Sequence, residues 1–466
     1  MAERSRTATS MNRERLAWLV CVVVLTVLAL RLPGSFGQRD DDYQFVRTLV
    51  DIHRQVVVNY VDPVDETALR DAAVAGMLSQ LDPFSEFIPP RLAQEFNRSL
   101  EGTFLGVGIQ VNQLESGAVE VVTPVDGSPA FEAGVQAGDR ILKVNGEDIT
   151  GLRLPEVVSK IRGPAGTKVT LLLRRVTGEE VELTMPRAEF VVPTIKGYSR
   201  TEDNAWNYWV REQPKIAYVR ITQFTPDTTA SLEPLLRRLL GEGMQGLVLD
   251  LRFNPGGRLD QAISVADLFL DSGVIVSTRG RNRPETVVRA SADNTLPRFP
   301  MAVILNEASA SASEILAGAL ADNRRAAIVG TRSYGKGSVQ EIIPLPGRGG
   351  ELKLTTAYYY LPSGRLVHRM RDATTWGVEP TVPVPLEPNQ ARQVWEARLA
   401  MENFRPPAAG PATTPEGDGS PPPGATPPTE GGPTTGGPTT RPLDVQLEHA
   451  VTTVLAMLMF TPEPPR

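Results

Sequence analysis

From residue 215 onward, the sequence alternates short apolar runs with amphipathic segments, and this alternation limits the folds open to the chain. The runs at residues 246–252 and 301–305 are dominated by aliphatic side chains and predict buried strands. The segments at 228–241 and from about 260 to 270 carry apolar residues at helical spacing. Strands alternating with helices are typical of an α/β layered domain. We therefore expect an α/β core over residues 188–404.

The residues before this core show two other patterns. Residues 101–187 contain short β-like runs broken by glycines, which predicts a β-rich domain. Residues 41–100 carry apolar residues at helical spacing, and Pro83 and the Pro89–Pro90 pair predict helix ends. We expect this helical region to act as a scaffold or as a dimer surface. The fold class is thus a multidomain α/β protein.

The N-terminal segment, residues 1–40, has the pattern of an export signal. An apolar run covers residues 16–30, and four arginines lie before it. A basic front and a run of this length are typical of a signal peptide or of a short uncleaved anchor. Because the basic residues lie on the N-terminal side, the rest of the chain is expected outside the cytoplasm. We expect an extracytoplasmic protein, periplasmic or in the cell envelope, whose N-terminus associates with the membrane.

The other end combines a linker with a helix. Residues 405–442 consist mainly of Pro, Gly, Thr, Ser and Ala, and cannot bury enough apolar surface to fold. Residues 443–460 then predict an amphipathic helix, with Asp444 as its N-cap. One helical face carries Leu447, Val451, Val454 and Leu458. A helix on a flexible tether must dock on its own chain or on a partner.

Composition excludes several classes of function. The net charge of −6 leaves no basic stripe for phosphates, so we expect no nucleic-acid partner. Cys21 is the only cysteine, which excludes disulfides and cysteine-based metal sites. The three histidines lie far apart in the sequence and form no zinc-protease motif. We expect neither a metal nor a cofactor.

Residues 306–340 contain the residues best suited to catalysis. Ser309, Ser311 and Ser313 alternate at a predicted helix start, and Lys336 lies between two glycines. The chain has only seven lysines and uses arginine at most basic positions. Arginine keeps its proton at working pH, whereas a desolvated lysine can lose it and act as a general base. A serine and a neutral lysine can together form a hydrolase that needs no histidine.

Two nearby motifs allow both a structural and a catalytic interpretation. Ser311-x-x-Glu314 before an apolar run fits a helix capping box, yet the free amides of that helix start could also bind an oxyanion. The turn at residues 253–257, Phe-Asn-Pro-Gly-Gly, follows a buried strand. It could be a tight strand-to-helix connection or an oxyanion hole. The residues alone leave both questions open.

A further glycine motif lies at the start of the β-rich domain, where Gly106 and Gly108 are separated by one residue. Such glycines let backbone amides converge on an anion, and a peptide's terminal carboxylate is one such ligand. The bound peptide would then extend along the sheet edge. A plain bend in the strand is the alternative. A nucleotide site is excluded because no helix follows the glycines.

These motifs resemble known families. Residues 100–187 resemble a bacterial PDZ domain, on Leu105-Gly-Val-Gly-Ile109 and on the Ser-Pro-Ala-x-x-Ala-Gly-x-x-x-Gly-Asp-x-Ile-x-x-Val-Asn-Gly run from Ser128. Residues 41–386 and the terminal helix resemble the S41 family of carboxyl-terminal processing (tail-specific) proteases. This resemblance is carried by residues 250–257, 309–315, 335–337 with Gln340, and 354–364. The family has a histidine where Phe84 stands in this chain.

The resemblance implies a serine endopeptidase that cleaves proteins near their C-terminus with a Ser-Lys dyad. It assigns Ser311 as the nucleophile, Lys336 as the general base and Gln340 as the residue that orients the amine. The backbone amides of Ala312 and of Gly256 or Gly257 would form the oxyanion hole. Leu105, Gly106, Val107, Gly108 and Ile109 would bind the free, apolar C-terminus of a protein or peptide substrate. A homodimer or higher homo-oligomer is implied as well.

Three other hypotheses fit parts of the sequence. Ser333-x-x-Lys336 matches the motif of penicillin-binding proteins, although it lies in a Gly-rich loop and its companion motifs are absent. His368 could serve in a Ser-His-Asp triad. The chain could also be a PDZ scaffold that binds protein tails on an inactive protease core.

Overall fold

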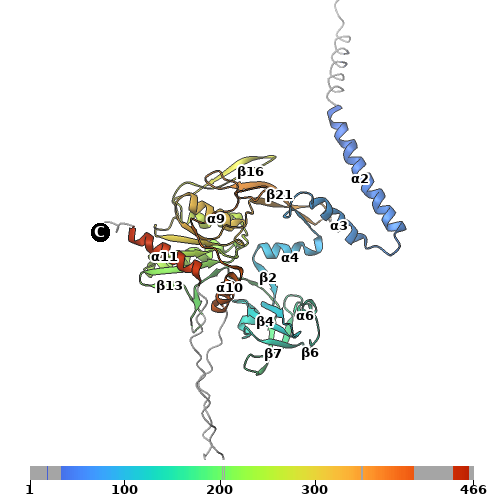
Figure 1. The fold of residues 1–466 in the computed structure, drawn as a ribbon. Helices are drawn as coiled ribbons and strands as arrows, with labels where there is room; N and C mark the ends of the chain where they lie inside the picture. Colours follow the sequence, from blue (N-terminus) through green and yellow to red (C-terminus); the bar gives the residue numbers. More distant parts are fainter. Residues whose placement is uncertain are drawn as a thin grey trace, which may run out of the picture. The chain divides into compact units, whose positions relative to one another are not determined.

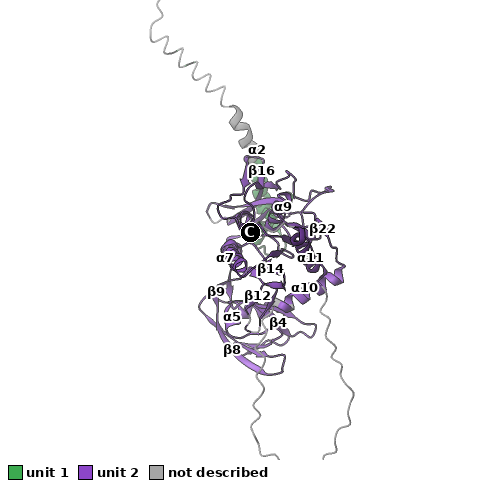
Figure 2. Ribbon diagram, turned by 90° about the vertical axis from the view of Figure 1, so that its left-hand side faces the viewer, with its two compact units in different colours: residues 1–81 green, residues 82–466 purple. Residues whose placement is uncertain are grey.

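The structure is a computed structural model that describes residues 18, 22, 33–201, 203, 205–347, 350–402 and 444–460. The chain divides into two compact units, residues 1–81 and 82–466 (Figure 2). Most of the predicted export run and the whole of the 405–442 tract lie outside the described residues. None of the helices that the structure describes is long and apolar enough to cross a membrane.

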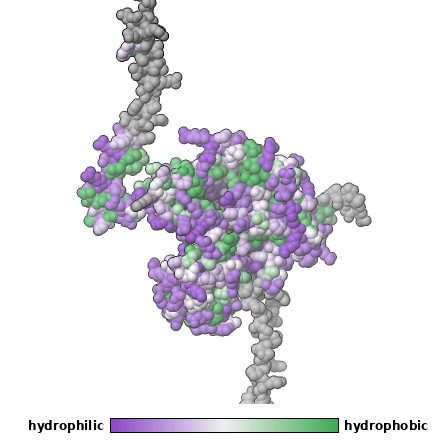
Figure 3. All heavy atoms as spheres, turned by 180° about the vertical axis from the view of Figure 1, so that it is seen from behind, coloured by the Kyte–Doolittle hydropathy of each residue, from purple (hydrophilic) through white to green (hydrophobic). Residues whose placement is uncertain are grey.

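The first unit is helical, as the sequence predicts. It contains α2 (Pro33–Asn59) and α3 (Glu66–Leu78), and the Asp65 carboxylate caps α3 by accepting from two backbone amides. The apolar residues that recur at helical spacing along α2 form a stripe on its surface. They are exposed, since Phe45 and Ile52 are each more than half accessible to solvent. Figure 3 shows hydrophobic atoms at the surface of this unit.

The second unit begins with β1 (Glu86–Ile88) and α4 (Pro90–Leu100). The Pro89–Pro90 pair was predicted to end a helix, and this prediction is wrong, because Pro90 is the first residue of α4. Proline suits this position, since the first helical residue needs no amide hydrogen and already has the ring's φ angle. The same residue type therefore marks a helix end in one context and a helix start in another.

A β-rich domain follows (Figure 1). Its main sheet has the order β3-β4-β5-β7-β8, with β6 beside β5, while β2 pairs with β9. Val121, Leu171 and Leu173 are fully buried in its core. Its elements are β2 (Thr103–Gly106), β3 (Ile109–Gln113), β4 (Val119–Pro124), α5 (Pro129–Glu132), β5 (Arg140–Val144), β6 (Glu147–Asp148), α6 (Leu154–Ile161), β7 (Lys168–Arg174), β8 (Glu180–Pro186) and β9 (Ala188–Val191).

The α/β core is built on a sheet of order β10-β14-β15-β18-β19-β22, with β13 beside β14. The strands from β14 to β22 are parallel. Every residue of β15 and β18 is buried, as expected for strands covered on both faces. The strands are β10 (Ile195–Lys196), β13 (Trp209–Glu212), β14 (Lys215–Ile221), β15 (Gly246–Asp250), β18 (Met301–Leu305), β19 (Ala327–Gly330) and β22 (Val382–Pro383).

Helices cover both faces of this sheet. One face packs against α7 (Thr228–Gly241), α8 (Leu259–Asp267) and α9 (Ala312–Asp322). The opposite face packs against α11 (Val445–Phe460), whose Leu447, Ala450 and Val454 are buried on it. Alternate strand residues serve the two faces, because successive side chains of a strand point in opposite directions. The predicted terminal helix is therefore present and docks on its own chain.

A second, antiparallel sheet completes the core, in the order β1-β21-β16-β17 with β20 beside β21. Its other strands are β16 (Val274–Gly280), β17 (Arg283–Arg289), β20 (Ser338–Pro344) and β21 (Glu351–Tyr360). The loop that carries Lys336 connects β19 of the parallel sheet to β20 of this one. The remaining elements are the β11 (Ser199–Arg200) and β12 (Trp206–Asn207) pair and α10 (Pro388–Glu402).

Candidate active site

Ser311 lies immediately before α9 in a strained conformation. Its backbone has a φ of 55° and a ψ of −115°, which costs a residue with a side chain about 1–3 kcal/mol. Only part of the predicted capping box is formed. The Glu314 carboxylate accepts from the Ser311 amide at 2.8 Å, whereas the Ser311 hydroxyl makes no capping hydrogen bond. The hydroxyl is therefore not used to start the helix.

The structure separates the three alternating serines. The Ser309 hydroxyl is buried and donates to the carbonyl of Leu251 at 2.9 Å. The Ser313 hydroxyl is also buried and donates to the carbonyl of Asn254 at 3.1 Å. Of the three, Ser311 alone lines a cavity. The two neighbouring serines instead fasten the helix start to the turn that follows β15.

That turn lies directly against Ser311. A Cβ atom on Gly256 would lie 2.7 Å from the Cβ of Ser311, and the φ angles of Gly256 and Gly257 are 103° and 137°. Glycine is needed at both positions for these reasons. The Gly256 amide donates to the Asn254 side chain at 2.9 Å. Within the described part of the chain, the amides of Gly257 and Ala312 have no hydrogen-bond partner.

Two hydrogen bonds fix the backbone of Lys336. Its amide donates to Glu314 at 2.8 Å, and its carbonyl accepts from the hydroxyl of Tyr359. The glycines on either side of Lys336 make room for close contacts. A Cβ atom on Gly337 would lie 2.3 Å from the backbone nitrogen of His368, and one on Gly335 would lie 2.7 Å from the Trp376 ring.

The Lys336 amine has an environment that favours its neutral form. Burial lowers the pKa of Lys336, and the nearby Lys353 ammonium lowers it further, while Glu314 and more distant carboxylates act in the opposite direction. Among the described residues, the amine has no hydrogen-bond or ion-pair partner. The Phe84 ring lies over it, with 4.9 Å between Nζ and the ring centroid. A ring face at this distance attracts an ammonium, so this contact favours the charged form and acts against the effect of burial.

Glu314 joins the serine and the lysine loop. One carboxylate oxygen accepts from the Ser333 hydroxyl at 2.5 Å and from the Gly335 amide at 2.6 Å. The other accepts from the amides of Ser311 and Lys336, both at 2.8 Å. Burial raises the pKa of this carboxyl, although the four hydrogen bonds favour its charged form. The sequence indicated Glu314 only as a helix cap, and its link to the lysine loop was missed.

Gln340 lies on β20, and its side-chain amide nitrogen donates to the Ser338 and Thr355 hydroxyls at 2.8 and 3.2 Å. No hydrogen bond joins Gln340 to Lys336 in the part of the chain that the structure describes. Thr355 donates in turn to the Asp82 carboxylate at 3.2 Å. The residue predicted to orient the lysine is thus present beside it, held by other groups.

A single cavity of about 360 Å³ brings most of the candidate residues together. Ser311, Ala312, Gly257, Lys336 and Gln340 all line it. Gly256 lies behind it, against Ser311. Within the described ranges, no cluster of three or more His, Cys, Asp or Glu side chains could hold a metal ion.

The alternative candidate residues lie elsewhere. Ser333 is buried, and its hydroxyl donates to Glu314 and accepts from the Val378 amide at 2.7 Å. His368 does not line the cavity, and its ring packs against Phe84 and Tyr358. Burial lowers the pKa of His368. The Ser333 hydroxyl is thus used in the contacts with Glu314 and Val378, and neither Ser333 nor His368 lines the cavity at Ser311.

A second cavity, of about 350 Å³, lies in the β-rich domain. Residues 105–109 line it together with Val158 and Ile161 of α6. Gly108 has a φ of 78°, and a Cβ atom there would lie 2.1 Å from the Cβ of Ser128. Gln223, from the α/β core, lines this cavity and also the cavity at Ser311. The two cavities are therefore neighbours.

Comparison with known proteins defines the class. Residues 215–384 match peptidase family S41, and residues 120–175 match the PDZ domain. The expected fold class is confirmed: a PDZ domain, an S41 protease core and a C-terminal helix. The protein is a serine-type peptidase that carries a PDZ domain.

Individual relatives narrow this class. The carboxy-terminal-processing protease of Bartonella bacilliformis is 38% identical, over 82% of this chain and 85% of that protein. The carboxy-terminal processing protease CtpA of Bacillus subtilis is 32% identical, over 79% and 76%. The solved photosystem II D1 C-terminal processing protease is 30% identical over 71% of this chain and 86% of its own, with a TM-score of 0.42. The chain belongs to the carboxy-terminal processing proteases of family S41.

We expect Glu314→Gln to reduce both stability and proteolysis. The amide keeps the volume of the side chain but replaces an acceptor oxygen with a donor, so buried N–H groups lose their partner, at about 1–3 kcal/mol. Denaturant unfolding should show this loss, and cleavage of an unstructured protein should slow at least about tenfold. Glu307→Gln, which changes an exposed carboxylate in the segment before α9, is the control. Wild-type stability and activity in Glu314→Gln would contradict the joining role.

We expect the Lys336 amine to lose its proton at lower pH than an ordinary lysine. Burial lowers the pKa of this amine below 10.5, the value of an ordinary lysine side chain. The acylation of Lys336 by acetic anhydride, followed by mass spectrometry across a pH series, should rise with a midpoint below that value. A midpoint at or above 10.5 in the parent chain would refute the lowered pKa.

Proposed function

We propose that this protein is an endopeptidase that cleaves proteins near their C-terminus with a Ser311–Lys336 dyad, while its PDZ domain binds the free C-terminal end. The observation that carries the proposal is the cavity that Ser311, Lys336, Gly257 and Ala312 share. Its lysine is desolvated and without an acidic partner among the described residues. The same chemistry fits the processing proteases that the chain resembles over most of its length.

The first chemical step requires a neutral Lys336. Burial and the Lys353 ammonium lower the pKa of Lys336, which favours the neutral amine. The Ser311 oxygen then attacks the carbonyl carbon of the scissile peptide bond, and its proton passes to Lys336 Nζ. The tetrahedral oxyanion accepts hydrogen bonds from the amides of Gly257 and Ala312. Gly256 contributes space, since its own amide is bound to Asn254.

The remaining steps reuse the same groups. The Lys336 ammonium donates its proton to the leaving amine, the peptide C–N bond breaks, and an ester to Ser311 remains. A water molecule gives a proton to Lys336 and attacks the carbonyl carbon of this ester. The bond to the Ser311 oxygen breaks, the new C-terminus is released, and the Lys336 ammonium returns its proton to the serine oxygen. Gln340 orients the amine through its carbonyl oxygen, which accepts from no described group.

Replacement of either dyad member should abolish cleavage. We expect Ser311→Ala and Lys336→Ala each to lower kcat by on the order of a thousandfold or more, because each removes a group that no neighbour replaces. Ser363→Ala and Lys143→Ala, which alter exposed residues, should leave kcat unchanged. Circular dichroism verifies that the variants fold. Cleavage that persists in Lys336→Ala would exclude the dyad.

Recognition of the substrate end depends on the second cavity. The backbone at residues 105–109 bends around glycines and can present amides to a carboxylate. Val158 and Ile161 supply an apolar wall for the last side chain. Because Gln223 lines both cavities, a peptide held at its end is close to Ser311. The substrate is therefore a protein or peptide with a free apolar C-terminus.

Amidation of a substrate's C-terminus should weaken its processing. A hydrogen bond to a charged group contributes about 1.5–3 kcal/mol, so loss of the carboxylate should raise KM roughly ten- to hundredfold. The test compares peptides that differ only at the last carbonyl, and acetylation of the N-terminus is the control. Equal KM values for the peptide with a free C-terminus and the amidated peptide would show that the terminal carboxylate is not recognised.

Two features of the first 100 residues extend the proposal. The arginines before the apolar run at 16–30 indicate export, so we place the protease outside the cytoplasm, in the periplasm or cell envelope. The exposed apolar stripe of α2 fits a surface that a second copy of the chain covers, which would give a homodimer or higher homo-oligomer.

A further inference from the structure

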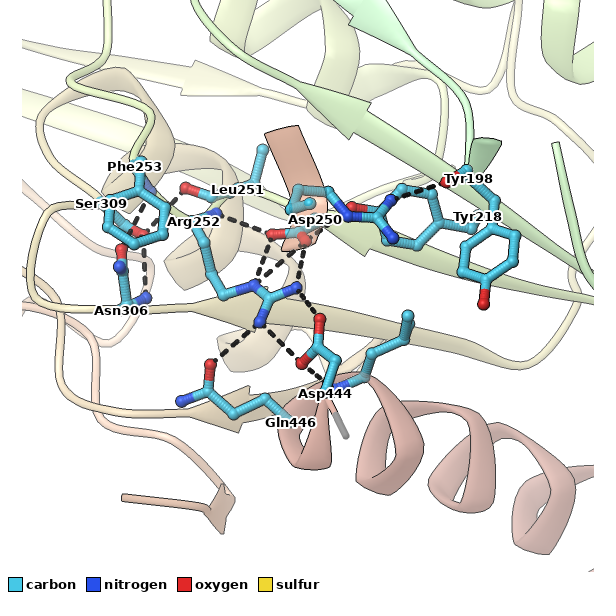
Figure 4. Close-up of polar contacts among 12 residues, drawn as sticks. Tyr198, Tyr218, Asp250, Leu251, Arg252, Phe253, Asn306, Ser309, Asp444 and Gln446 are labelled. Atoms are coloured by element: carbon cyan, nitrogen blue, oxygen red, sulfur yellow. Dashed lines mark hydrogen bonds and ion pairs between the residues drawn. The ribbon is translucent and has the colours of Figure 1, made fainter. Parts of the chain in front are cut away.

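Arg252 is a buried arginine between β15 and the turn at Ser311 (Figure 4). On one side it binds Asp250, with 2.7 Å between Nη2 and a carboxylate oxygen. Asp250 also accepts from the Tyr218 hydroxyl at 2.7 Å. Burial opposes ionisation of Asp250, yet the Arg252 guanidinium offsets this and lowers the pKa to about 2. The pair is therefore charged inside the protein.

On its other side, Arg252 binds the start of α11. Both Asp444 oxygens accept from it, at 2.9 Å from Nη1 and 2.8 Å from Nη2. The Gln446 side chain accepts from Nη1 at 3.2 Å. In the described part of the chain, Nη1 has no acceptor other than these two residues. Without α11, one end of this buried guanidinium would lose all its hydrogen bonds.

Asp444 also starts α11, because it accepts from the Leu447 amide at 3.1 Å. The helix then lies so close to β15 that a Cβ atom on Gly246 would be 2.3 Å from Val454 Cγ1. Gln446 adds a hydrogen bond to the Val384 carbonyl at 2.9 Å. These contacts fix the position of α11 on the sheet. The contact with Arg252 lies at the start of the helix.

The chain continues directly from Arg252 into the turn that faces Ser311. Phe253 has a φ of 58°, which is strained for a non-glycine residue, and its amide donates to Asn306 at 2.9 Å. Asn254 accepts from the Ala310 amide at 3.0 Å through its carbonyl, and from the Gly256 amide through its side chain. A strained turn keeps its shape only where its surroundings hold both ends. Arg252 is the anchor at the first end.

We propose that Asp444 is a positioning residue, which links the docking of α11 through Arg252 to the geometry of the oxyanion turn at residues 253–257. The C-terminal helix is then an internal activator of the protease, supplied by the far end of the chain. The expected effect of Asp444 on catalysis rests on the proposed function. It makes a separate structural claim, that the turn is ordered only while Asp444 holds Arg252.

The test compares Asp444→Asn with Glu448→Gln in the full-length chain. Each substitution replaces one carboxylate at the first turns of the C-terminal helix, but Glu448 is exposed and makes no hydrogen bond to Arg252 among the described residues. For Asp444→Asn we expect kcat to fall about ten- to hundredfold with KM within twofold, because a misplaced oxyanion donor acts on the transition state alone. Amides of residues 253–257 should exchange hydrogen for deuterium at least about tenfold faster. Glu448→Gln should match the parent chain in both measurements.

Two outcomes would overturn the proposal. One is Asp444→Asn with kcat within twofold of the parent chain. The other is unchanged exchange at residues 253–257 in a variant that retains the fold by circular dichroism. Hydrogen exchange also separates this proposal from the proposed function. If the parent chain cleaves no substrate in a Ser311-dependent way, the proposed function fails, and the exchange comparison still decides whether Asp444 orders the turn.

Discussion

The candidate site depends on one buried carboxylate, that of Glu314. Its four hydrogen bonds fix the backbone of Ser311 at the start of α9 and the backbone of the lysine loop that follows β19. These two segments belong to different parts of the core, and the side chains that the chemistry needs extend from them. Since buried N–H groups are costly to leave unpaired, the arrangement resists distortion. Three backbone amides and the Ser333 hydroxyl occupy the two carboxylate oxygens, and among the described residues no ion pair joins Glu314 to the Lys336 amine.

The sheet that carries these segments is stabilised from both sides. Three helices cover one face and a helix from the far end of the chain covers the other. Each face contributes to the site, because Ser311 lies at the start of α9 while Asp444 and Gln446, at the start of α11, bind Arg252 just before the turn at residues 253–257. The strain at Ser311 and Phe253 is thus balanced by contacts on opposite sides of one sheet.

Local signals in the sequence predicted much of this architecture. The bounds of α7 and β18 agree with the apolar periodicity, and the Asp444 cap was identified from its position before a helix. Choosing Ser311 among three serines needed the family resemblance, because Ser309 and Ser313 differ from it only in tertiary contacts. The ion pair of Arg252 and Asp444 spans 192 residues and leaves no periodic trace. The Phe84 ring over Lys336 is equally non-local.

Gln223 has a consequence for the form in which a substrate must arrive. This side chain lines both the cavity of the PDZ domain and the cavity at Ser311, so under the proposed function the protein sets the distance between the bound end of a substrate and its cleavage point. Under the proposed function, a substrate would then need an extended tail long enough to reach from one cavity to the other. The enzyme would in this way test the disorder and the length of a tail together, with no need to read its sequence in between.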